Sequence, residues 1–193
     1  MKKISIKILL LIILSIPAKA DSEINNIYEG DINSPLKLIV FESLTCGHCA
    51  TFHEKVYPNL KREFIDTNLI SIEFRSFPLD LAALNASIIA HCKNDGKSDV
   101  LHFLYENQSK WAKGNNIQDV NENLKQLIKT TNFNINIDKC LNKKYLEDHI
   151  LTDRINAVKK YDINSTPTLI INGKKFDKSL NFKNIKKTLE KML

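Results

Sequence analysis

The sequence has little of the material from which linkers, repeats and membrane spans are made. Glycine and proline occur only five times each among 193 residues, and the absence of a long Gly-, Pro- or Ser-rich stretch excludes a flexible interdomain linker. No internal repeat is present, which excludes solenoids and propellers. No apolar run reaches the roughly 20 residues that a membrane-spanning helix needs. We therefore expect one domain, or one domain with an insertion.

The N-terminal segment has the pattern of an export signal. Lys2 and Lys3 form a basic start, residues 8–14 are apolar, and the Ala-Lys-Ala sequence at 18–20 is typical of a cleavage site. The alternative, an uncleaved anchor, needs a longer apolar run. Four lysines and no acid fall in residues 1–20, so removing them lowers the formal net charge from +6 to +2. We expect a cleaved signal peptide over 1–20 and an exported protein.

Hydrophobic periodicity predicts a strand, a helix and a second strand early in the chain. Residues 36–41 form an almost continuous apolar run, typical of a strand covered on both faces. Residues 70–75 alternate between apolar and polar, which predicts a half-buried strand. Between them we expect a helix that is kinked or broken near Pro58. Its apolar stripe comprises Cys49, Phe52, Val56, Leu60 and Phe64.

Residues 80–160 show helical stripes and no strand pattern. The stripes are Leu81, Leu84, Ile88 and Cys92; Leu101, Leu104 and Trp111; Val120, Leu124 and Leu127; and Leu151, Ile155 and Val158. Strand character returns at 168–171, followed by the hairpin pair Asn172-Gly173, a short strand near Lys175 and Phe176, and a closing helix. The order βαβ, helical insert, ββα predicts an α/β thioredoxin fold. Residues 21–79 and 162–193 would form its core, and residues 80–161 an inserted helical domain.

The chemistry is concentrated in Cys46-Gly47-His48-Cys49, at the expected start of the first helix. Unpaired N–H groups and the helix dipole lower the pKa of a cysteine at a helix N-terminus, so Cys46 is the expected attacking thiolate. Cys49, on the core-facing stripe, is the expected resolving thiol. His48 adds a positive charge or a hydrogen bond near the sulfur, and Gly47 leaves the sulfur open to approach.

The same electrostatics indicate the direction of the redox reaction. Each tenfold increase in the acidity of Cys46 moves the potential of the couple by roughly 30 mV towards oxidising values. A strongly stabilised thiolate therefore favours a disulfide that is readily passed to substrates.

Two other interpretations of the motif are weaker. A zinc site made of Cys46, Cys49 and His53 lacks a good fourth ligand. A purely structural bridge across so short a loop constrains the unfolded chain little. We expect no metal and no cofactor.

Thr166-Pro167-Thr168 stands immediately before the returning strand. Proline is tolerated at the first residue of a strand because it need not donate to the ladder. A cis bond before Pro167 would instead let the loop approach an active site with its backbone exposed. Spacing alone favours the plain strand start.

Taken together, these residues resemble the DsbA-like thiol-disulfide oxidoreductases of the bacterial periplasm, within the thioredoxin superfamily. The similarity covers nearly the whole chain after residue 20. The segments that carry it are residues 41–50 with Phe52-His53 and Pro58, residues 74–79, Ala90-His91-Cys92, Glu106-Asn107-Gln108 with Trp111, and Thr166-Pro167-Thr168 at the position of the family's cis-proline loop.

The resemblance implies a periplasmic dithiol oxidase, with Thr166 and Pro167 in the loop that contacts the substrate backbone. It implies reduced or unfolded exported proteins as substrates and a DsbB-like membrane quinone reductase as the oxidant. Family members commonly carry an acid beneath the active site as a proton relay. Glu42 is the candidate, although the relay is expected two residues earlier, where Val40 stands; a solvated glutamate at the strand end is an equal alternative.

Cys92 and Cys140 both lie in the helical region. Cys92 ends an apolar stripe, so it could be a small buried hydrophobe. Some DsbA-like proteins have a second disulfide in this region, and an oxidising compartment favours one. We expect a structural Cys92–Cys140 disulfide worth about 4 kcal/mol in the chain-entropy model.

Two other functional classes stay open. One is a reductase or isomerase of the same fold, for which threonine before the proline and the Gly-His dipeptide are suggestive. Isomerases usually add a dimerisation domain, for which this chain has no room, so we expect a monomer. The other is a non-enzymatic metal-binding protein or holdase chaperone. The lysines that crowd the last twenty residues interleave with apolar positions, so we expect a solvated helix face and no nucleic-acid partner.

Overall fold

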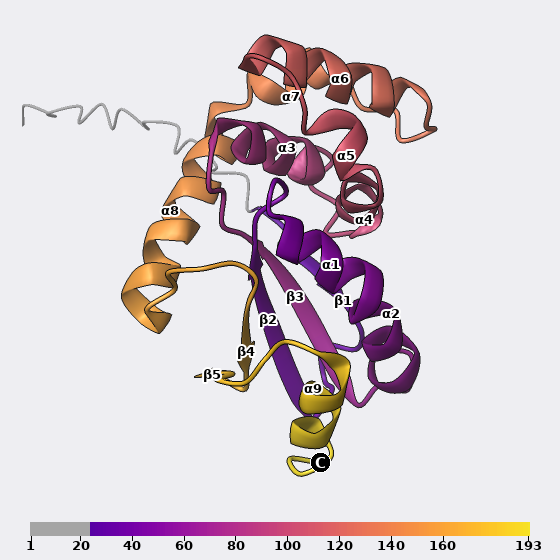
Figure 1. Ribbon diagram of the computed structural model, residues 1–193, viewed down its shortest axis with the longest axis vertical. Coiled ribbons are helices and arrows are strands. Elements are labelled where there is room, and N and C mark those ends of the chain that lie inside the picture. The colour runs from indigo at the N-terminus through magenta and orange to yellow at the C-terminus, as the bar shows by residue number, and fades with distance from the viewer. Residues whose placement is uncertain (1–23) are drawn as a thin grey trace, which may run out of the picture.

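A five-stranded mixed sheet lies at the centre of the computed structural model, which describes residues 24–193 (Figure 1). The signal peptide expected at 1–20 lies outside the described residues. The strand order is β1-β3-β2-β4-β5, and only β2 and β3 are parallel. The strands are β1 (Ile27–Glu29), β2 (Leu36–Glu42), β3 (Ile70–Ser76), β4 (Thr168–Ile171) and β5 (Lys174–Lys175).

The helix that follows β2 covers one face of the sheet and is broken where proline predicts a break. It consists of α1 (Gly47–Lys55), α2 (Tyr57–Leu60) and the π-helical turn η1 (Lys61–Ile65). Val56 separates α1 from α2, and Pro58 lies in the first turn of α2, where its missing N–H costs nothing. Every member of the expected stripe from Cys49 to Phe64 is buried. The stripe and the break are confirmed.

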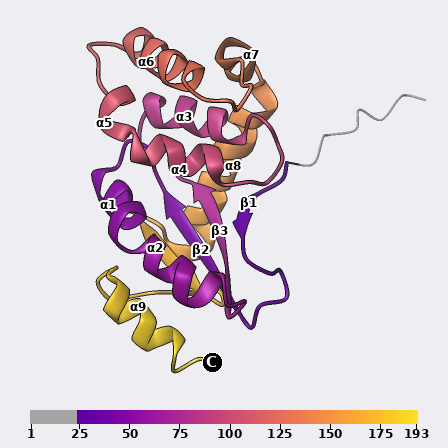
Figure 2. The same cartoon turned by 90° about the vertical axis from the view of Figure 1, so that its right-hand side faces the viewer.

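The two faces of the sheet are covered by different helices. Leu38 and Val40 of β2 pack in one cluster with residues of α1 and of α9 (Phe182–Leu189). Phe41, on the opposite face, packs with Ala157 of α8 (Lys144–Tyr161). Figure 2 shows α1, α2 and α9 on one side of the strands and α8 on the other. The expectation that β2 is covered on both faces is confirmed.

The helices between β3 and β4 gather at one end of the sheet, and α8 runs back alongside it (Figure 1). Before α8 come α3 (Leu81–His91), α4 (Asp99–Glu106), α5 (Gln108–Trp111), α6 (Ile117–Lys129) and α7 (Ile137–Leu141). Over residues 24–193, none of the helices combines the length and the apolar content that a membrane crossing demands. The α/β thioredoxin fold with added helices is confirmed.

Two details of the sequence prediction are wrong. Ile155 and Val158 were expected on a buried stripe but are 51% and 43% exposed. Helix α8 has apolar residues on more than one face, and its packing against α3 and β3 buries Leu146, Ile150 and Ala157 instead. Leu81 is likewise 55% exposed, at the first position of α3.

Strand β3 was expected to be half-buried and is instead covered on both faces. It lies between β1 and β2, and of its polar set Ser71 is fully buried while Glu73 and Arg75 are partly buried. Arg75 extends towards α8, where its Nη1 lies 3.0 Å from Asp153 Oδ1. Strand β1, which the sequence prediction missed, has only three residues. So short an edge strand leaves almost no periodicity to detect.

Candidate active site

The Cys46-Gly47-His48-Cys49 motif lies where β2 passes into α1. Cys46 is the N-cap residue, with φ −78° and ψ 119°, and its carbonyl oxygen accepts from the N–H groups of Cys49 and Ala50. Its side chain is half-buried, whereas Cys49, one turn on, is completely buried. No atom lies within 4 Å of the place a Cβ would occupy on Gly47, so the approach to the helix end is open. His48 is exposed.

The loop before β4 brings Thr166 to Cys46 from 120 residues away in the sequence. The Cys46 thiol donates to the Thr166 carbonyl oxygen at 3.3 Å. The Thr166–Pro167 bond is cis. Spacing alone favoured a proline at an ordinary strand start, without a cis bond, and that prediction is wrong. The Thr166 hydroxyl oxygen is buried without a hydrogen-bond partner among the described residues. It is therefore available to donate to Cys46 once the thiol has lost its proton.

The pKa of Cys46 lies below its ordinary value. Partial burial acts to raise it. The Thr166 hydroxyl, which can donate to the thiolate, the N–H groups of Cys49 and His48, and the Cys49 thiol together outweigh that effect. These donors converge because the sulfur sits at a helix N-terminus, where backbone N–H groups have no helical partner. The arrangement stabilises a thiolate on the accessible sulfur.

The pKa of Cys49 is shifted in the opposite direction. Burial raises it most, and the negative charge of Glu42 raises it further. A buried sulfur far from water and close to a carboxylate keeps its proton. The surroundings of the two cysteines therefore act in opposite directions, towards a thiolate at Cys46 and a thiol at Cys49.

Glu42 is buried at 2% exposure, which rules out a solvated glutamate at the strand end. Its Oε2 lies 2.7 Å from His53 Nε2, and its Oε1 has no hydrogen-bond partner within residues 24–193. His53 was a candidate zinc ligand with Cys46 and Cys49. Its ring nitrogens face Glu42 and His102 instead, and the described residues contain no group of His, Cys, Asp and Glu suited to a metal.

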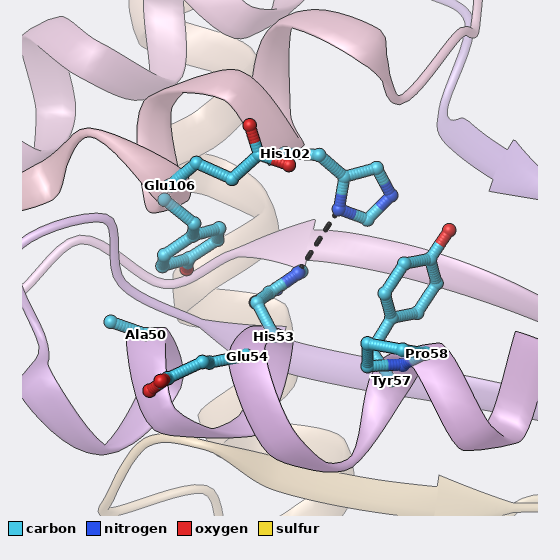
Figure 3. Close-up of a pocket in the computed structure, with 8 residues that line it drawn as sticks. Ala50, His53, Glu54, Tyr57, Pro58, His102 and Glu106 are labelled. Carbon is cyan, nitrogen blue, oxygen red and sulfur yellow. Dashed lines mark hydrogen bonds between the residues drawn. The ribbon is translucent and has the colours of Figure 1, made fainter.

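A cavity of about 490 Å³ opens between α1, α2 and α4, beside the catalytic motif (Figure 3). His53 and His102 point towards each other across it. The Tyr105 ring stacks on His53 with centroids 4.0 Å apart. Sequence reasoning missed His102 and Tyr105 because α4 is brought to α1 only by the tertiary fold. The only part of this cluster that the sequence indicates is His53, which follows Cys49 by one helical turn.

The other two cysteines lie away from the motif. Cys92, at the end of α3, is joined to Cys140 of α7 in a disulfide, the pairing that the sequence analysis expects. Both belong to a second apolar cluster with Leu84, Ile88, Leu146 and Ile150. Cys46 and Cys49 are free thiols in this structure.

Comparison with known proteins agrees with this geometry. A family model described as thioredoxin matches residues 22–191. A Rickettsia prowazekii protein, provisionally named a protein-disulfide oxidoreductase, is 28% identical over 173 residues, covering 88% of this chain and 62% of the relative. The chain therefore spans less than two thirds of that relative's length. Disulfide bond formation protein D of Bacillus subtilis is 25% identical over 174 residues, covering 85% of this chain and 75% of the relative.

Among solved structures, α-DsbA1 of Wolbachia pipientis matches with a TM-score of 0.78 and 28% identity. The match covers 87% of this chain and 90% of that chain. The helices between β3 and β4 are therefore part of the shared fold.

Proposed function

Because the chain belongs to the thioredoxin family and has the fold of the DsbA-like proteins, we propose that it is a thiol-disulfide oxidoreductase that donates a Cys46–Cys49 disulfide to exported proteins. The observation that carries the proposal is the opposite environment of the two thiols. Hydrogen-bond donors lower the pKa of Cys46, while burial and Glu42 raise that of Cys49. A couple whose outer sulfur is stabilised as a thiolate is a good oxidant, because its reduced form is favoured.

The reaction proceeds by two exchanges. A substrate thiolate attacks Cys46 Sγ, which is the accessible sulfur, and Cys49 leaves with the electron pair of the broken bond. A second substrate thiolate then attacks the substrate sulfur of the mixed disulfide. Cys46 leaves as its stabilised thiolate, and the substrate departs with a new disulfide. Cys49 needs a proton when it leaves, and the buried carboxyl of Glu42 is the group beside it that supplies one.

The substrate lies against the loop that contains Thr166 and Pro167. The Thr166 carbonyl is already at Cys46, and proline has no N–H, so an extended substrate chain pairs with the remaining backbone groups of this loop. The bare surface at Gly47 leaves room for that chain. His48, exposed beside the sulfur, adds to the stabilisation of the thiolate.

The signal pattern over residues 1–20 supports export to the periplasm, where substrate thiols are oxidised. There a membrane quinone reductase re-oxidises the Cys46–Cys49 pair by taking two electrons from the reduced dithiol. This protein acts as a monomer.

The reduction potential of the Cys46–Cys49 couple, measured by equilibration with glutathione buffers, tests the proposal. We expect a value well above the approximately −270 mV of thioredoxin, nearer the approximately −120 mV of a strong oxidant. The Cys46→Ser variant is expected to lose oxidation of a reduced dithiol peptide. Cys49→Ser, offered a peptide that already carries a disulfide, is expected to accumulate the mixed disulfide, because Cys46 opens the peptide bridge and no second thiol resolves it. A potential like that of thioredoxin would instead make the protein a reductase. Two results together would indicate a holdase: the unaltered protein does not oxidise the dithiol peptide, and the Cys46→Ser variant still suppresses aggregation.

A further inference from the structure

A chain of hydrogen bonds runs from the buried carboxyl of Glu42 to Glu29, through two histidine rings. His53 Nε2 lies 2.7 Å from Glu42 Oε2, and His53 Nδ1 lies 3.1 Å from His102 Nδ1. His102 Nε2 lies 2.7 Å from Glu29 Oε1. Figure 3 shows the central contact, with His53 on α1 and His102 on α4. Each link in the chain has the length of one hydrogen bond.

The number of protons in this chain follows from the hydrogen bonds. Glu29 is a carboxylate at neutral pH, because hydrogen bonds from His102, Ser98 and Tyr57 outweigh the effect of burial and lower its pKa to about 2. Glu29 therefore accepts, and His102 Nε2 carries a hydrogen. The contact between the two Nδ1 atoms also needs a hydrogen, since two lone pairs facing each other at 3.1 Å would repel.

Whichever Nδ1 carries that hydrogen, the total is the same. With the hydrogen on His102, the His102 ring is an imidazolium, His53 donates through Nε2, and Glu42 is ionised. With the hydrogen on His53 Nδ1, either His53 is the imidazolium or Glu42 is protonated and donates to His53 Nε2. In every case Glu42, His53 and His102 together hold one proton more than a carboxylate and two neutral imidazoles would.

We propose that the His53–His102 pair stores this extra proton and exchanges it with Cys49 through Glu42. The inference rests on the proposed function of the Cys46–Cys49 couple. His53 and His102 are positioning residues, because they deliver a proton to Glu42 and touch no substrate atom.

The proton moves in three hops as the disulfide opens. When Cys49 leaves with the electron pair of the S–S bond, the shared hydrogen passes from His102 Nδ1 to His53 Nδ1. The Nε2 hydrogen of His53 passes to Glu42, and the carboxyl gives a proton to Cys49 Sγ. The store loses one proton and Cys49 gains one, so charge and atoms balance. The buried Oε1 of Glu42, which has no partner in the described part of the chain, is free for this transfer.

The store is refilled from a face that does not hold the substrate. His53 and His102 line the cavity of about 490 Å³, and His102 with Glu29 also lines a second cavity of about 520 Å³. Neither Cys46 nor Thr166 lines either cavity. Water in these cavities can therefore return a proton to His102 while a substrate occupies the loop of Thr166 and Pro167.

The titratable groups that face the two rings come from five elements and from the π-helical turn η1. They are Glu29 of β1, Glu42 of β2, Cys49 and Glu54 of α1, Tyr57 of α2, Tyr105 and Glu106 of α4, and Lys61, whose Nζ lies 4.0 Å from Glu29 Oε2.

Nuclear magnetic resonance of the ¹⁵N-labelled, reduced protein tests the store directly and needs no activity. We expect one hydrogen that correlates with both Nδ1 atoms through a coupling across the hydrogen bond. Two Nδ1 atoms without a hydrogen between them would overturn the proposal, whatever the protein catalyses.

Kinetics test whether the stored proton is used. His102→Asn puts an amide nitrogen near the place of Nδ1; it can hold His53 but cannot pass a proton on. We expect single-turnover oxidation of a dithiol peptide to slow about tenfold at pH 7, with the unfolding midpoint changed little. The matched control is His149→Asn, which removes a histidine on α8 that takes no part in the chain of hydrogen bonds. This variant should keep the full rate.

A third variant separates proton delivery from support of the fold. In His102→Ala, added imidazole should restore the rate, and a series of substituted imidazoles should do so in the order of their basicity. A shared hydrogen together with an unchanged rate in His102→Asn would show that the stored proton does not reach Cys49. Failure of the unaltered protein to oxidise any dithiol would overturn the proposed function and leave the spectroscopic result standing.

Discussion

Cys46 and Cys49 are separated by two residues, yet their surroundings favour opposite protonation states. The difference comes from their register on one helix. Cys46, at the N-cap, receives hydrogen bonds from backbone groups that have no helical partner. Cys49, one turn later, faces the core and the Glu42 carboxyl. A shift of the helix start by one residue would remove this asymmetry, so the position at which β2 ends is part of the chemistry.

At the same scale, His91 makes the stability of the fold depend on pH. It is 6% exposed, its Nδ1 has no hydrogen-bond partner within residues 24–193, and burial, with a smaller effect of the charge on His149, lowers its pKa to about 4. Between pH 6.5 and 4 the His91 side chain is protonated in the unfolded chain but stays neutral in the folded protein. The free energy of unfolding should therefore fall with decreasing pH across this window, by about 3 kcal/mol in total.

Urea unfolding at several pH values measures this contribution. We expect His91→Leu to flatten the dependence between pH 6.5 and 4, whatever its effect on stability at pH 7. An equally steep dependence in the variant would mean that other groups, such as carboxylates with lowered pKa values, cause the loss.

Whether a residue of the candidate site could be predicted from the sequence depends on how far away in the sequence its partners lie. Cys46, Gly47, His48 and Cys49 are recognisable because their chemistry depends on one helix start. Thr166 needed the family resemblance, since nothing local shows that its loop reaches Cys46. His102 and Glu29 could not be found at all, because their hydrogen bonds join elements that only the folded chain brings together.

At the scale of elements, Asp80 connects the inserted helices to the catalytic turn. Its Oδ1 accepts from the Ala83 N–H at 2.7 Å and caps α3, while its Oδ2 accepts from the Thr45 hydroxyl at 2.8 Å. Thr45 precedes Cys46 directly. Asp80→Ala should therefore cost about 1 kcal/mol through loss of the cap, and should also loosen the turn before α1.

Asn116→Ala is the matched control for this prediction. Asn116 caps α6 by accepting from the Asp119 N–H, and it lies on a helix remote from the motif. Both variants should lose similar stability in urea, but only Asp80→Ala should speed hydrogen exchange at the amides of residues 45–47. Equal exchange in the two proteins would show that the Thr45 contact does not hold the turn.

The elements themselves could be predicted where one face alone is apolar. The stripe of α1 and the hairpin at Asn172-Gly173, where φ is 44° and 80°, were both legible in the sequence. The buried face of helix α8 could not be predicted, because its apolar residues lie on several sides. Which side is buried depends on the elements that pack against the helix. Strand β3 was misjudged for a related reason: helices packed against the sheet bury Ser71 and partly bury Glu73 and Arg75 of its polar set.

At the scale of the whole molecule, the apolar cluster that includes the catalytic motif is separate from the one that includes the disulfide. The larger joins α1, α9 and the sheet to α4 and α6. The smaller lies among α3, α7 and α8, and the Cys92–Cys140 disulfide is inside it. The catalytic motif belongs to the first cluster, so we expect the bridge to affect the stability of the fold more than the chemistry of Cys46.

The disulfide closes a long loop, and this determines how much its removal should cost. Its Cα atoms are 5.5 Å apart and the cysteines are separated by 48 positions, for which the chain-entropy model gives about 4 kcal/mol. Cys92→Ala/Cys140→Ala should lower the free energy of unfolding by up to that amount, measured in urea with the Cys46–Cys49 pair oxidised in both proteins. Alanine is the suitable replacement because both positions are buried. An unchanged urea midpoint would show that the loop-closure argument fails here, for example because residual contacts already restrict the denatured chain as much as the bridge does.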